Sequence, residues 1–248
     1  MNKQKGFFIN EKSEKSKKNK IMFLIITAHP DDETIFSGGI LARYPHNSFV
    51  FCSSHGLGFA KKKSERKTLK KIREKEFKNA MKKLGVKFEI IDDIDRLNYH
   101  SMLKRLGNEK TQDRIKTLLK PKIKKLVLDL KPNFVITHNS FGEYGHFLHK
   151  TIYKAVFEAL KEIKKDFNNY KEVSKLKLMT FAPKLKIRNI NTNRLLKTKH
   201  QTINYKIILS KSEFNKKLSA LKCYSSQKSV FEANKEMDFR VENYHLVF

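Results

Sequence analysis

The segment LIITAHPDDETIFSGG (residues 24–39) joins an apolar run of strand length to a helix-like run. A continuous apolar run of this kind is typical of a strand buried on both faces of a sheet. The turn between the two runs places four acid–base or metal-binding groups within five positions: His29, Asp31, Asp32 and Glu33. Ligands of parallel α/β sheets bind beyond the carboxyl ends of the strands. Taken alone, the turn is equally consistent with a helix cap and with a reactive site.

Strand-like and helix-like runs alternate through the rest of the chain. Further strands are expected in NSFVFCSS (47–54), VKFEIID (86–92), NFVITH (133–138), KLKLMTFA (175–182) and INYKIILS (203–210). Helices are expected at 33–44, 64–84, 113–132 and 145–165, and from Ser210 or Ser212 onward. Strands that alternate with helices form right-handed βαβ units. The predicted fold is therefore α/β, a single Rossmann-like domain with a mostly parallel sheet flanked by helices.

Several local signals refine this prediction. Gly85 is expected to cap the helix at 64–84, and Ser37-Gly38-Gly39 to interrupt the helix at 33–44. Pro121 is expected to break or kink its helix, because proline removes a backbone donor. Residues 92–110 are expected to be rich in loops, and residues 239–248 to form an edge strand or a closing segment.

The charge of the chain is unusually positive. Of 54 basic residues 45 are lysine, and the formal net charge of the 248 residues is +29. Such a charge suggests nucleic acid or an anionic membrane as partner. The lysines, however, are spread along the whole chain, and no zinc-finger spacing, aromatic RNA-binding signature or basic heptad region accompanies them. We therefore favour a general lysine bias and expect no specific nucleic-acid partner.

Cysteine usage and the N-terminal segment indicate a location. Cys52 and Cys223 form no CxxC pair, which is typical of a reducing compartment. The first 20 residues lack the apolar core of a signal peptide, and the longest apolar run is too short to span a bilayer. We expect a cytoplasmic protein with a lysine-rich arm at 1–19 and one domain at 20–248.

A second cluster follows the expected strand at 133–138. In THNSFGEYGHFLH (137–149), His146 and His149 are spaced i, i+3 at the start of a helix. The zincin motif requires histidines at i and i+4 with a glutamate between them, so this pair does not match the motif of a zincin protease. Two His/Asp clusters at strand-to-helix junctions of one parallel sheet converge if their strands are neighbours. This pairing favours a reactive site over a simple cap.

The pair AHPDDE (28–33) and GHFLH (145–149) resembles the LmbE/PIG-L family of metal-dependent N-acetylglucosamine deacetylases, which includes the GlcNAc-phosphatidylinositol de-N-acetylases. The resemblance extends approximately over 73–85 and to YSSQ at 224–227. It implies Zn²⁺, or another divalent transition metal, bound by His29, Asp32 and His149.

The resemblance also implies roles for four neighbouring residues. Asp31 would be the general base, and His146 would stabilise the oxyanion or protonate the leaving amine. Tyr144 matches a tyrosine that some members use near the oxyanion, and Arg73 matches an arginine on the sugar-binding side. His55 lies beyond the second strand, where contact with the substrate and an ordinary turn are equally consistent.

One departure from the family is visible. Many bacterial members read GHPDH. In this chain Phe147 and Leu148 stand in place of the Pro-Asp pair. If that aspartate orients the neighbouring histidine, its role here is empty or is filled by another group such as Glu143.

The implied function is removal of the N-acetyl group from a GlcNAc-containing conjugate. Zinc lowers the pKa of a bound water to about 7, and Asp31 would take its proton. The substrate would be a small molecule or glycan, and the lysine excess favours an anionic one. The alternative is a lysine-rich nucleic-acid-binding protein with a non-catalytic metal site. Structural zinc sites are closed by four ligands, usually with cysteine, so three ligands without cysteine favour catalysis. The aglycone and the oligomeric state do not follow from the sequence.

Overall fold

The computed structural model describes residues 22–60, 62–167, 171–183, 186–188, 195–197, 201–228 and 238–248. The arm expected at 1–19 lies outside the described residues. The strands are β1 (Phe23–Thr27), β2 (Ser48–Cys52), β3 (Lys87–Ile90), β4 (Phe134–Thr137), β5 (Lys177–Phe181), β6 (Lys186–Arg188), β7 (Leu195–Lys197), β8 (Tyr205–Ile208) and β9 (Val241–Leu246). The helices are α1 (Asp32–Arg43), α2 (Lys63–Leu84), α3 (Asp93–Leu97), α4 (Tyr99–Leu130), α5 (Gly142–Gly145), α6 (Phe147–Asp166), α7 (Lys171–Ser174) and α8 (Lys211–Leu221).

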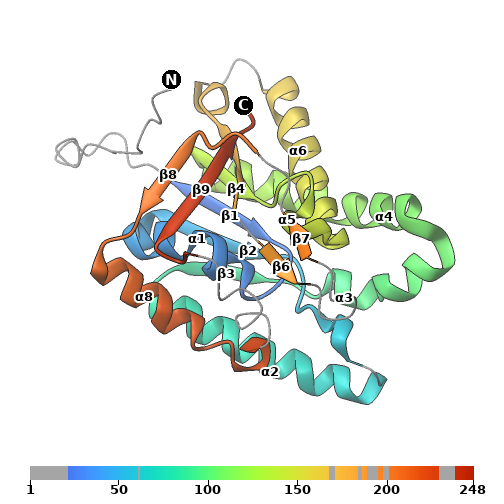
Figure 1. Ribbon diagram of the computed structural model, residues 1–248. Helices are drawn as coiled ribbons and strands as arrows, with labels where there is room; N and C mark the ends of the chain where they lie inside the picture. The colour runs from blue at the N-terminus through green and yellow to red at the C-terminus, as the bar shows by residue number, and fades with distance from the viewer. Residues whose placement is uncertain are drawn as a thin grey trace.

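Seven strands form one sheet in the order β3-β2-β1-β4-β5-β9-β8. The pairs from β3 to β5 are parallel, and β9 pairs antiparallel with both β5 and β8. Helices cover both faces, with α1, α2 and α8 on one side and α4 and α6 on the other (Figure 1). The predicted α/β class, with a mostly parallel sheet flanked by helices in a single domain, is confirmed.

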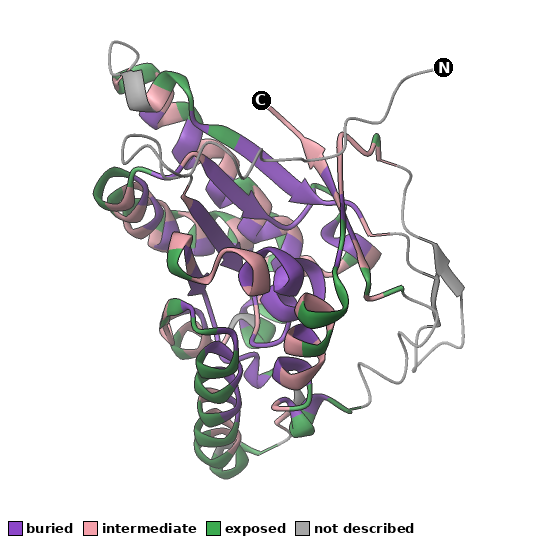
Figure 2. Ribbon diagram, turned by 90° about the vertical axis from the view of Figure 1, so that its left-hand side faces the viewer, coloured by how far each residue is buried: buried purple, intermediate pink, exposed green. Residues whose placement is uncertain are grey.

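The central strands are buried, and the helices turn their charged faces outward. All five residues of β1 are buried, as expected of a strand that is covered on both faces. In Figure 2 the central strands β1, β2, β4 and β5 and helix α1 are largely buried, whereas the outer face of α2 is exposed. The lysine-rich side of α2 therefore lies in solvent, and its apolar side packs through Phe77, Ala80 and Leu84. Gly85 ends α2 with φ 71° and ψ 30°, which confirms the predicted cap.

The position of β1 between β2 and β4 brings the two sequence motifs together. Ile26 is the register partner of Thr137, so both strands end at the same edge of the sheet. The turn after β1 carries His29 to Glu33, and the loop after β4 carries His138 to His149. The expected convergence of the two clusters thus follows directly from the strand order.

The C-terminal strand differs from its prediction. β9 is an internal strand, and β8 lies at the edge of the sheet. The reason is a buried polar network that sequence patterning does not reveal. Glu242 and Tyr244 on β9 are buried, and Glu242 forms an ion pair of 2.7 Å with the buried Lys217 of α8. These contacts draw the last strand between β5 and β8.

Residues 92–110 and Pro121 also differ from the prediction. The segment expected to be loop-rich contains α3 and the first turns of α4. The non-helical residue inside α4 is Gly107, at φ 75° and ψ 177°, and the helix continues through Pro121. Glycine adopts positive φ without a steric penalty. Pro121 and Thr117 are exposed, so the Thr117 carbonyl that loses its helical partner faces water.

Helix α1 is continuous through the Ser-Gly-Gly segment that was expected to interrupt it. The glycines instead permit close packing. A Cβ on Gly38 would lie 2.7 Å from Lys217 Cγ, and one on Gly39 would lie 2.1 Å from Leu209 Cδ2. The N–H groups of Gly39 and Ile40 donate to the Glu242 carboxylate at 2.6 and 3.2 Å. At this segment α8 and β9 therefore lie close against α1.

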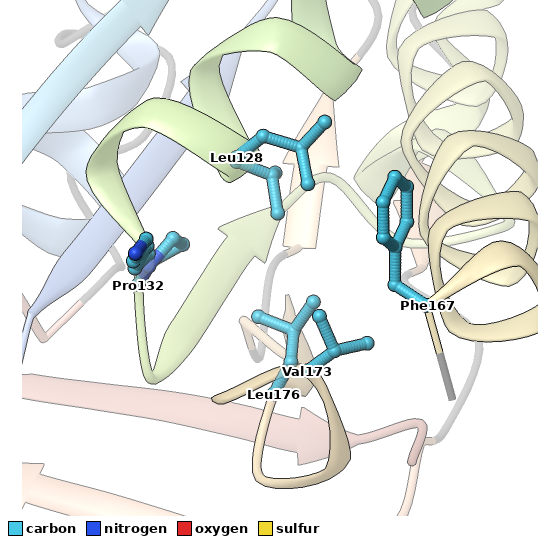
Figure 3. Close-up of a pocket in the computed structure, with 7 residues that line it drawn as sticks. Leu128, Pro132, Phe167, Val173 and Leu176 are labelled. Carbon is cyan, nitrogen blue, oxygen red and sulfur yellow. The ribbon is translucent and has the colours of Figure 1, made fainter. Parts of the chain in front are cut away.

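An apolar cavity of about 170 Å³ lies at the opposite edge of the sheet from the two motifs. Leu128, Pro132, Phe167, Val173 and Leu176 surround it (Figure 3). It is formed by the C-terminal ends of α4 and α6 and the segment before β5, so it takes no part in the site described below. Within the described residues, no helix is both long enough and apolar enough to cross a membrane.

Candidate metal centre and its acid–base neighbours

The turn after β1 does not act as an ordinary helix cap. Asp31 is the residue before α1, but its side chain makes no capping hydrogen bond. Its backbone has φ 111° and ψ −37°, a region that residues other than glycine rarely adopt. Such a conformation costs about 1–3 kcal/mol and is found mainly at functional sites. The structure therefore favours the reactive-site interpretation of this turn.

Three atoms from the two motifs meet at one point. His29 Nδ1 lies 3.3 Å from Asp32 Oδ2, and His149 Nε2 lies 3.3 Å from His29 Nδ1 and 3.5 Å from Asp32 Oδ2. Two ligand atoms at about 2.0–2.1 Å from one tetrahedral ion are roughly 3.4 Å apart. Imidazole nitrogen and carboxylate oxygen are donors that suit zinc and other transition metals. The three side chains therefore fit a metal ion in both spacing and chemistry.

Two further histidines adjoin these atoms. The metal-competent atoms of His29, His146 and His149 lie within 4.8 Å of one another, as do those of Asp32, His138 and His149. His149 is common to both groups and is fully buried. His29 and His146 are half-buried, so they face the solvent side of the cluster. The geometry thus permits a metal site that is accessible from one side.

The carboxylate of Glu143 contacts the Nδ1 atoms of His138 and His149. Its Oε2 lies 2.6 Å from His149 Nδ1 and 3.0 Å from His138 Nδ1. The N–H of Ala28 donates to His138 Nε2 at 2.9 Å, so the proton of His138 is on Nδ1. A carboxylate that accepts from Nδ1 of a histidine leaves Nε2 free to bind a metal. His149 is held in this way, with Nε2 directed at Asp32 and His29.

The charges around Glu143 and Asp32 favour ionised carboxylates. Burial alone would raise the pKa of Glu143, but His138 and His149 lower it to about 2. Burial would likewise raise the pKa of Asp32, but His149, His138 and His29 hold it well below its usual value. Burial lowers the pKa of His149, but Asp32 and Glu143 outweigh it, and the net shift is upward. The cluster therefore contains two fixed negative charges.

The surroundings of Asp31 favour the protonated carboxyl, in contrast to those of Asp32 and Glu143. Burial, followed by the neighbouring charges of Asp32 and Glu33, raises its pKa well above the usual value. Glu33 is buried as well, and burial raises its pKa to about 7. Asp31 and Asp32 therefore differ in charge preference although they are adjacent in sequence.

His146 and Tyr144 lie on the accessible side of the cluster. The ring centroid of His146 is 4.8 Å from that of His29 and 4.4 Å from that of His149. Within the described residues, His146 Nδ1 has no hydrogen-bond partner. Burial, and then His149 and His29, lower the pKa of His146 well below its usual value, so the ring is neutral. The Tyr144 ring lies 5.9 Å from that of His146.

Arg73 and His55 form one side wall of the site. Arg73 Nη1 donates to the carbonyls of His55 and Gly56 at 2.9 and 2.7 Å. A Cβ on Gly56 would lie 2.2 Å from Arg73 Nη1 and 3.0 Å from His29 Cδ2, so the loop is packed between these side chains. His55 is buried, and its backbone N–H and Nδ1 lie 2.6 and 3.1 Å from Asp95 Oδ2. Both residues adjoin the metal cluster through Gly56.

Sequence reasoning gave no role to several residues that support the site. Asp95 holds the loop at His55, but it lies in the segment expected to be loop-rich. Glu33 and Tyr224 contact each other behind Asp31. Tyr224 belongs to the YSSQ segment, which the resemblance had included without giving it a role. The AHPDDE spacing identified Glu33 as part of the turn, but not its partner.

Two strand-to-helix loops of a parallel sheet that present histidine and aspartate side chains define an α/β protein with a candidate metal centre. A family model described as PIG-L: GlcNAc-PI de-N-acetylase matches residues 24–160, and the chain belongs to this family. The chain is also 37% identical over 148 residues to the uncharacterized protein L374 of Acanthamoeba polyphaga mimivirus. That match covers 54% of this chain and 56% of the relative, little more than half of the length of either.

Solved structures share the fold. GalB, the 4-carboxy-2-hydroxymuconate hydratase of Pseudomonas putida KT2440, has a TM-score of 0.64 at 17% identity, over 92% of this chain and 96% of that one. N,N'-diacetylchitobiose deacetylase of Pyrococcus horikoshii has a TM-score of 0.58 at 16% identity, over 91% and 83%. The A40926 pseudoaglycone deacetylase Dbv21 has a TM-score of 0.57 at 16% identity, over 86% and 85%. At such identities the likeness concerns the fold alone, and this fold serves a hydratase as well as deacetylases.

Proposed function

We propose that this protein is a metal-dependent hydrolase that removes the N-acetyl group from a GlcNAc-containing conjugate. The observation that carries the proposal is the set of His29 Nδ1, Asp32 Oδ2 and His149 Nε2, which lie 3.3–3.5 Å from one another. Membership in the PIG-L family supports the reaction, since the family is described by a de-N-acetylase. The fold is shared with a hydratase, so it does not select the reaction by itself.

The proposed metal is zinc, held by His29, Asp32 and His149. When bound, such an ion lowers the pKa of water and polarises the amide carbonyl. Glu143 keeps the proton of His149 on Nδ1, and Asp32 contributes a permanent negative charge. These features make the donor set ready for a cation before the cation binds.

Asp31 is the proposed general base. It follows the proposed ligand His29 by two positions, has a strained backbone, and is in neither group of metal-competent side chains among the described residues. A base works best when its pKa is near the operating pH, and burial beside two carboxylates moves the pKa of Asp31 in that direction. Asp31 would accept a proton from the attacking water and return it to the departing amine.

His146 is proposed to stabilise the oxyanion. A ring with a strongly lowered pKa is neutral at working pH, so it donates a hydrogen bond more readily than it delivers a proton. Its unpartnered buried Nδ1 is a group that such a contact would satisfy. Tyr144, beside it, is proposed to act on the same side of the substrate.

The substrate is proposed to be a small molecule or glycan that bears GlcNAc, with an anionic group favoured by the net charge of +29. Arg73 and His55 are proposed to line the sugar-binding side, because both adjoin the metal cluster through Gly56. Their contacts here fix the loop between them, so they would shape this side of the site as well as touch the sugar.

A nucleic-acid-binding protein with a non-catalytic metal site is the competing interpretation. A structural zinc site has four protein ligands, usually including cysteine. Neither of the two groups of metal-competent side chains in the described residues contains a cysteine. The test is amine release from a panel of GlcNAc conjugates, with zinc-loaded protein, with chelated protein and with Asp31→Ala. We expect release that chelation and Asp31→Ala both abolish. Equal release by Asp31→Ala and wild type, or inertness of the zinc-loaded wild type on every conjugate, would overturn the proposal.

A further inference from the structure

The strained backbone of Asp31 requires an external support. At φ 111° and ψ −37° the residue would relax to a commoner conformation unless its neighbours held it. Its carbonyl is fixed by the first turn of α1, where it accepts from the N–H groups of Thr34 and Ile35 at 3.0 and 2.8 Å. Its own N–H lies on the other side of the strained dihedral and donates to Glu33 Oε2 at 3.1 Å. Glu33 therefore decides whether the peptide before Asp31 keeps its orientation.

Glu33 is itself held by two hydroxyl groups. Its Oε1 accepts from Thr34 Oγ1 at 2.6 Å and from the hydroxyl of Tyr224. Glu33 and Thr34 are fully buried, and Tyr224 is 1% exposed, so no water competes for these oxygens. Thr34 is the next residue and moves with Glu33, whereas Tyr224 comes from a segment 191 residues away. The hydroxyl of Tyr224 is thus the contact that holds the Glu33 carboxylate from outside its own helix.

The segment that carries Tyr224 is anchored independently. Ser225 Oγ, Ser226 N and Ser226 Oγ donate to the Glu76 carboxylate of α2 at 2.8, 2.8 and 2.6 Å. Glu76 lies one helical turn after Arg73, which holds the loop at Gly56. The short turn at Ser225–Gln227 therefore fastens Tyr224 to the same helix that forms the side wall of the site.

We propose that Tyr224 is a positioning residue for Asp31, acting through the Glu33 carboxylate. The inference rests on the proposed function, in which Asp31 is the base. Loss of the hydroxyl alone would leave the ring packed in the core, where it belongs to the cluster on the α1 side of the sheet. It would free Glu33 Oε1 to rotate, and Oε2 would no longer be held against the N–H of Asp31. The base would then lose its direction while the metal ligands remained in place.

The chain offers a matched control for this test. Tyr244 is also buried, and its hydroxyl also contacts a buried glutamate, Glu242, at 2.8 Å. It packs against α1 at Phe36 and Ser37, away from the turn at Asp31. Tyr224→Phe and Tyr244→Phe therefore remove the same group from the same kind of environment, and only the first is connected to Asp31.

The experiment measures four quantities in both variants: the exchange rate of the Asp31 amide in the metal-free protein by NMR, the bound metal, the unfolding midpoint, and kcat with KM for amine release. We expect Tyr224→Phe to accelerate exchange at Asp31 and to lower kcat roughly tenfold to a hundredfold, the usual effect of losing an outer-shell partner, with metal content and KM unchanged. Tyr244→Phe should lower the unfolding midpoint similarly while both kcat and Asp31 exchange stay at wild-type values.

A second pair of variants tests the relay residue. Glu33→Gln keeps an oxygen that can accept from the Asp31 amide, whereas Glu33→Ala keeps none. Slow Asp31 exchange in Glu33→Gln and fast exchange in Glu33→Ala are expected. Unchanged Asp31 exchange in Tyr224→Phe, or equal losses of kcat in the two tyrosine variants, would overturn the proposal. The exchange measurement needs no turnover, so it decides the positioning role even if every GlcNAc conjugate proves inert and the proposed function fails.

Discussion

Asp31 and Asp32 are adjacent in the chain, but their surroundings shift their pKa values in opposite directions. Histidines at 29, 138 and 149 surround Asp32 and hold its pKa well below the usual range. Asp31 is buried beside the carboxylates of Asp32 and Glu33, which together with burial raise its pKa well above the usual range. A pair of titratable groups whose environments separate their pKa values is a common arrangement for dividing roles at an active site. The backbone strain at Asp31 is what allows two neighbouring side chains to occupy such different surroundings.

Replacement of the two aspartates by asparagine should separate these roles. Asp31→Asn removes a base without removing a proposed ligand, so bound metal should stay at the wild-type level. Turnover should fall by roughly 10²–10⁴-fold, the usual contribution of a general base. Asp32→Asn should lose the metal as well as the turnover. Elemental analysis alongside amine release checks both variants, and a metal-free Asp31→Asn protein would contradict the assignment of Asp31 as base.

The histidines can be sorted by metal content alone. His149 belongs to both groups of metal-competent side chains, so His149→Ala should abolish stoichiometric binding. His146→Ala should keep the metal and lose turnover, because its proposed contact is with the substrate. Isothermal titration of the metal-free proteins with zinc distinguishes these outcomes. Loss of zinc binding in His146→Ala would instead make His29, His146 and His149 the ligand set.

Glu143 should affect metal affinity without contacting the metal. Glu143→Gln keeps the shape of the side chain but removes the charge that His149 Nδ1 and His138 Nδ1 approach at 2.6 and 3.0 Å. Mutation of such outer-shell partners typically weakens metal binding about 10–100-fold. Glu158→Gln, on the outer side of α6 where Glu158 pairs with Lys116, is the control and should bind normally. Equal zinc affinities in the two variants would show that Glu143 does not orient the ligand.

The raised pKa of Glu33 should appear in the pH dependence of stability. Its pKa is about 7 in the folded protein and 4.5 when unperturbed, so between these values the folded state holds a proton that the unfolded state releases. Stability from this group is therefore complete below pH 4.5 and is lost as the pH rises through 7, by on the order of 3 kcal/mol. Urea unfolding of metal-free wild type and Glu33→Gln at pH 5 and pH 8 measures the difference. The wild type should lose more stability than Glu33→Gln across this interval; an equal loss would mean that Glu33 does not titrate there.

The fold followed from local sequence signals to a large extent, because buried parallel strands and amphipathic helices leave clear patterns. β1 and α2 with its cap at Gly85 were expected and are present. β9 was misplaced because its position depends on the buried pair of Lys217 and Glu242, which are far apart in sequence and look like ordinary surface residues. The break or kink expected at Pro121 is not present for a related reason: the cost of a helix proline depends on exposure, which sequence does not state, and the non-helical residue of α4 is Gly107 instead.

In the candidate site, too, the residues within local motifs could be predicted from the sequence and those that depend on distant contacts could not. Its chemistry-bearing residues lie in two short motifs that the sequence shows directly, whereas the pairing of β1 with β4 that joins these motifs was only a condition of the prediction and is seen in the structure. The residues that support them, such as Tyr224 and Asp95, come from distant segments and carry no local signal. Glu143 is intermediate, since the missing Asp of GHPDH indicated a vacant role and the structure places Glu143 against His149.

The buried ion pair also makes one lysine a natural reporter of unfolding. Among the lysines whose burial the structure describes, Lys217 is the one classed as buried, and it is in contact with Glu242. An amine-reactive reagent should modify the exposed lysines quickly and reach Lys217 only when α8 separates from α1 and β9. The labelling rate of the peptide that contains Lys217 would therefore follow the opening of this side of the fold, in a protein whose many other lysines provide an internal standard for reagent strength.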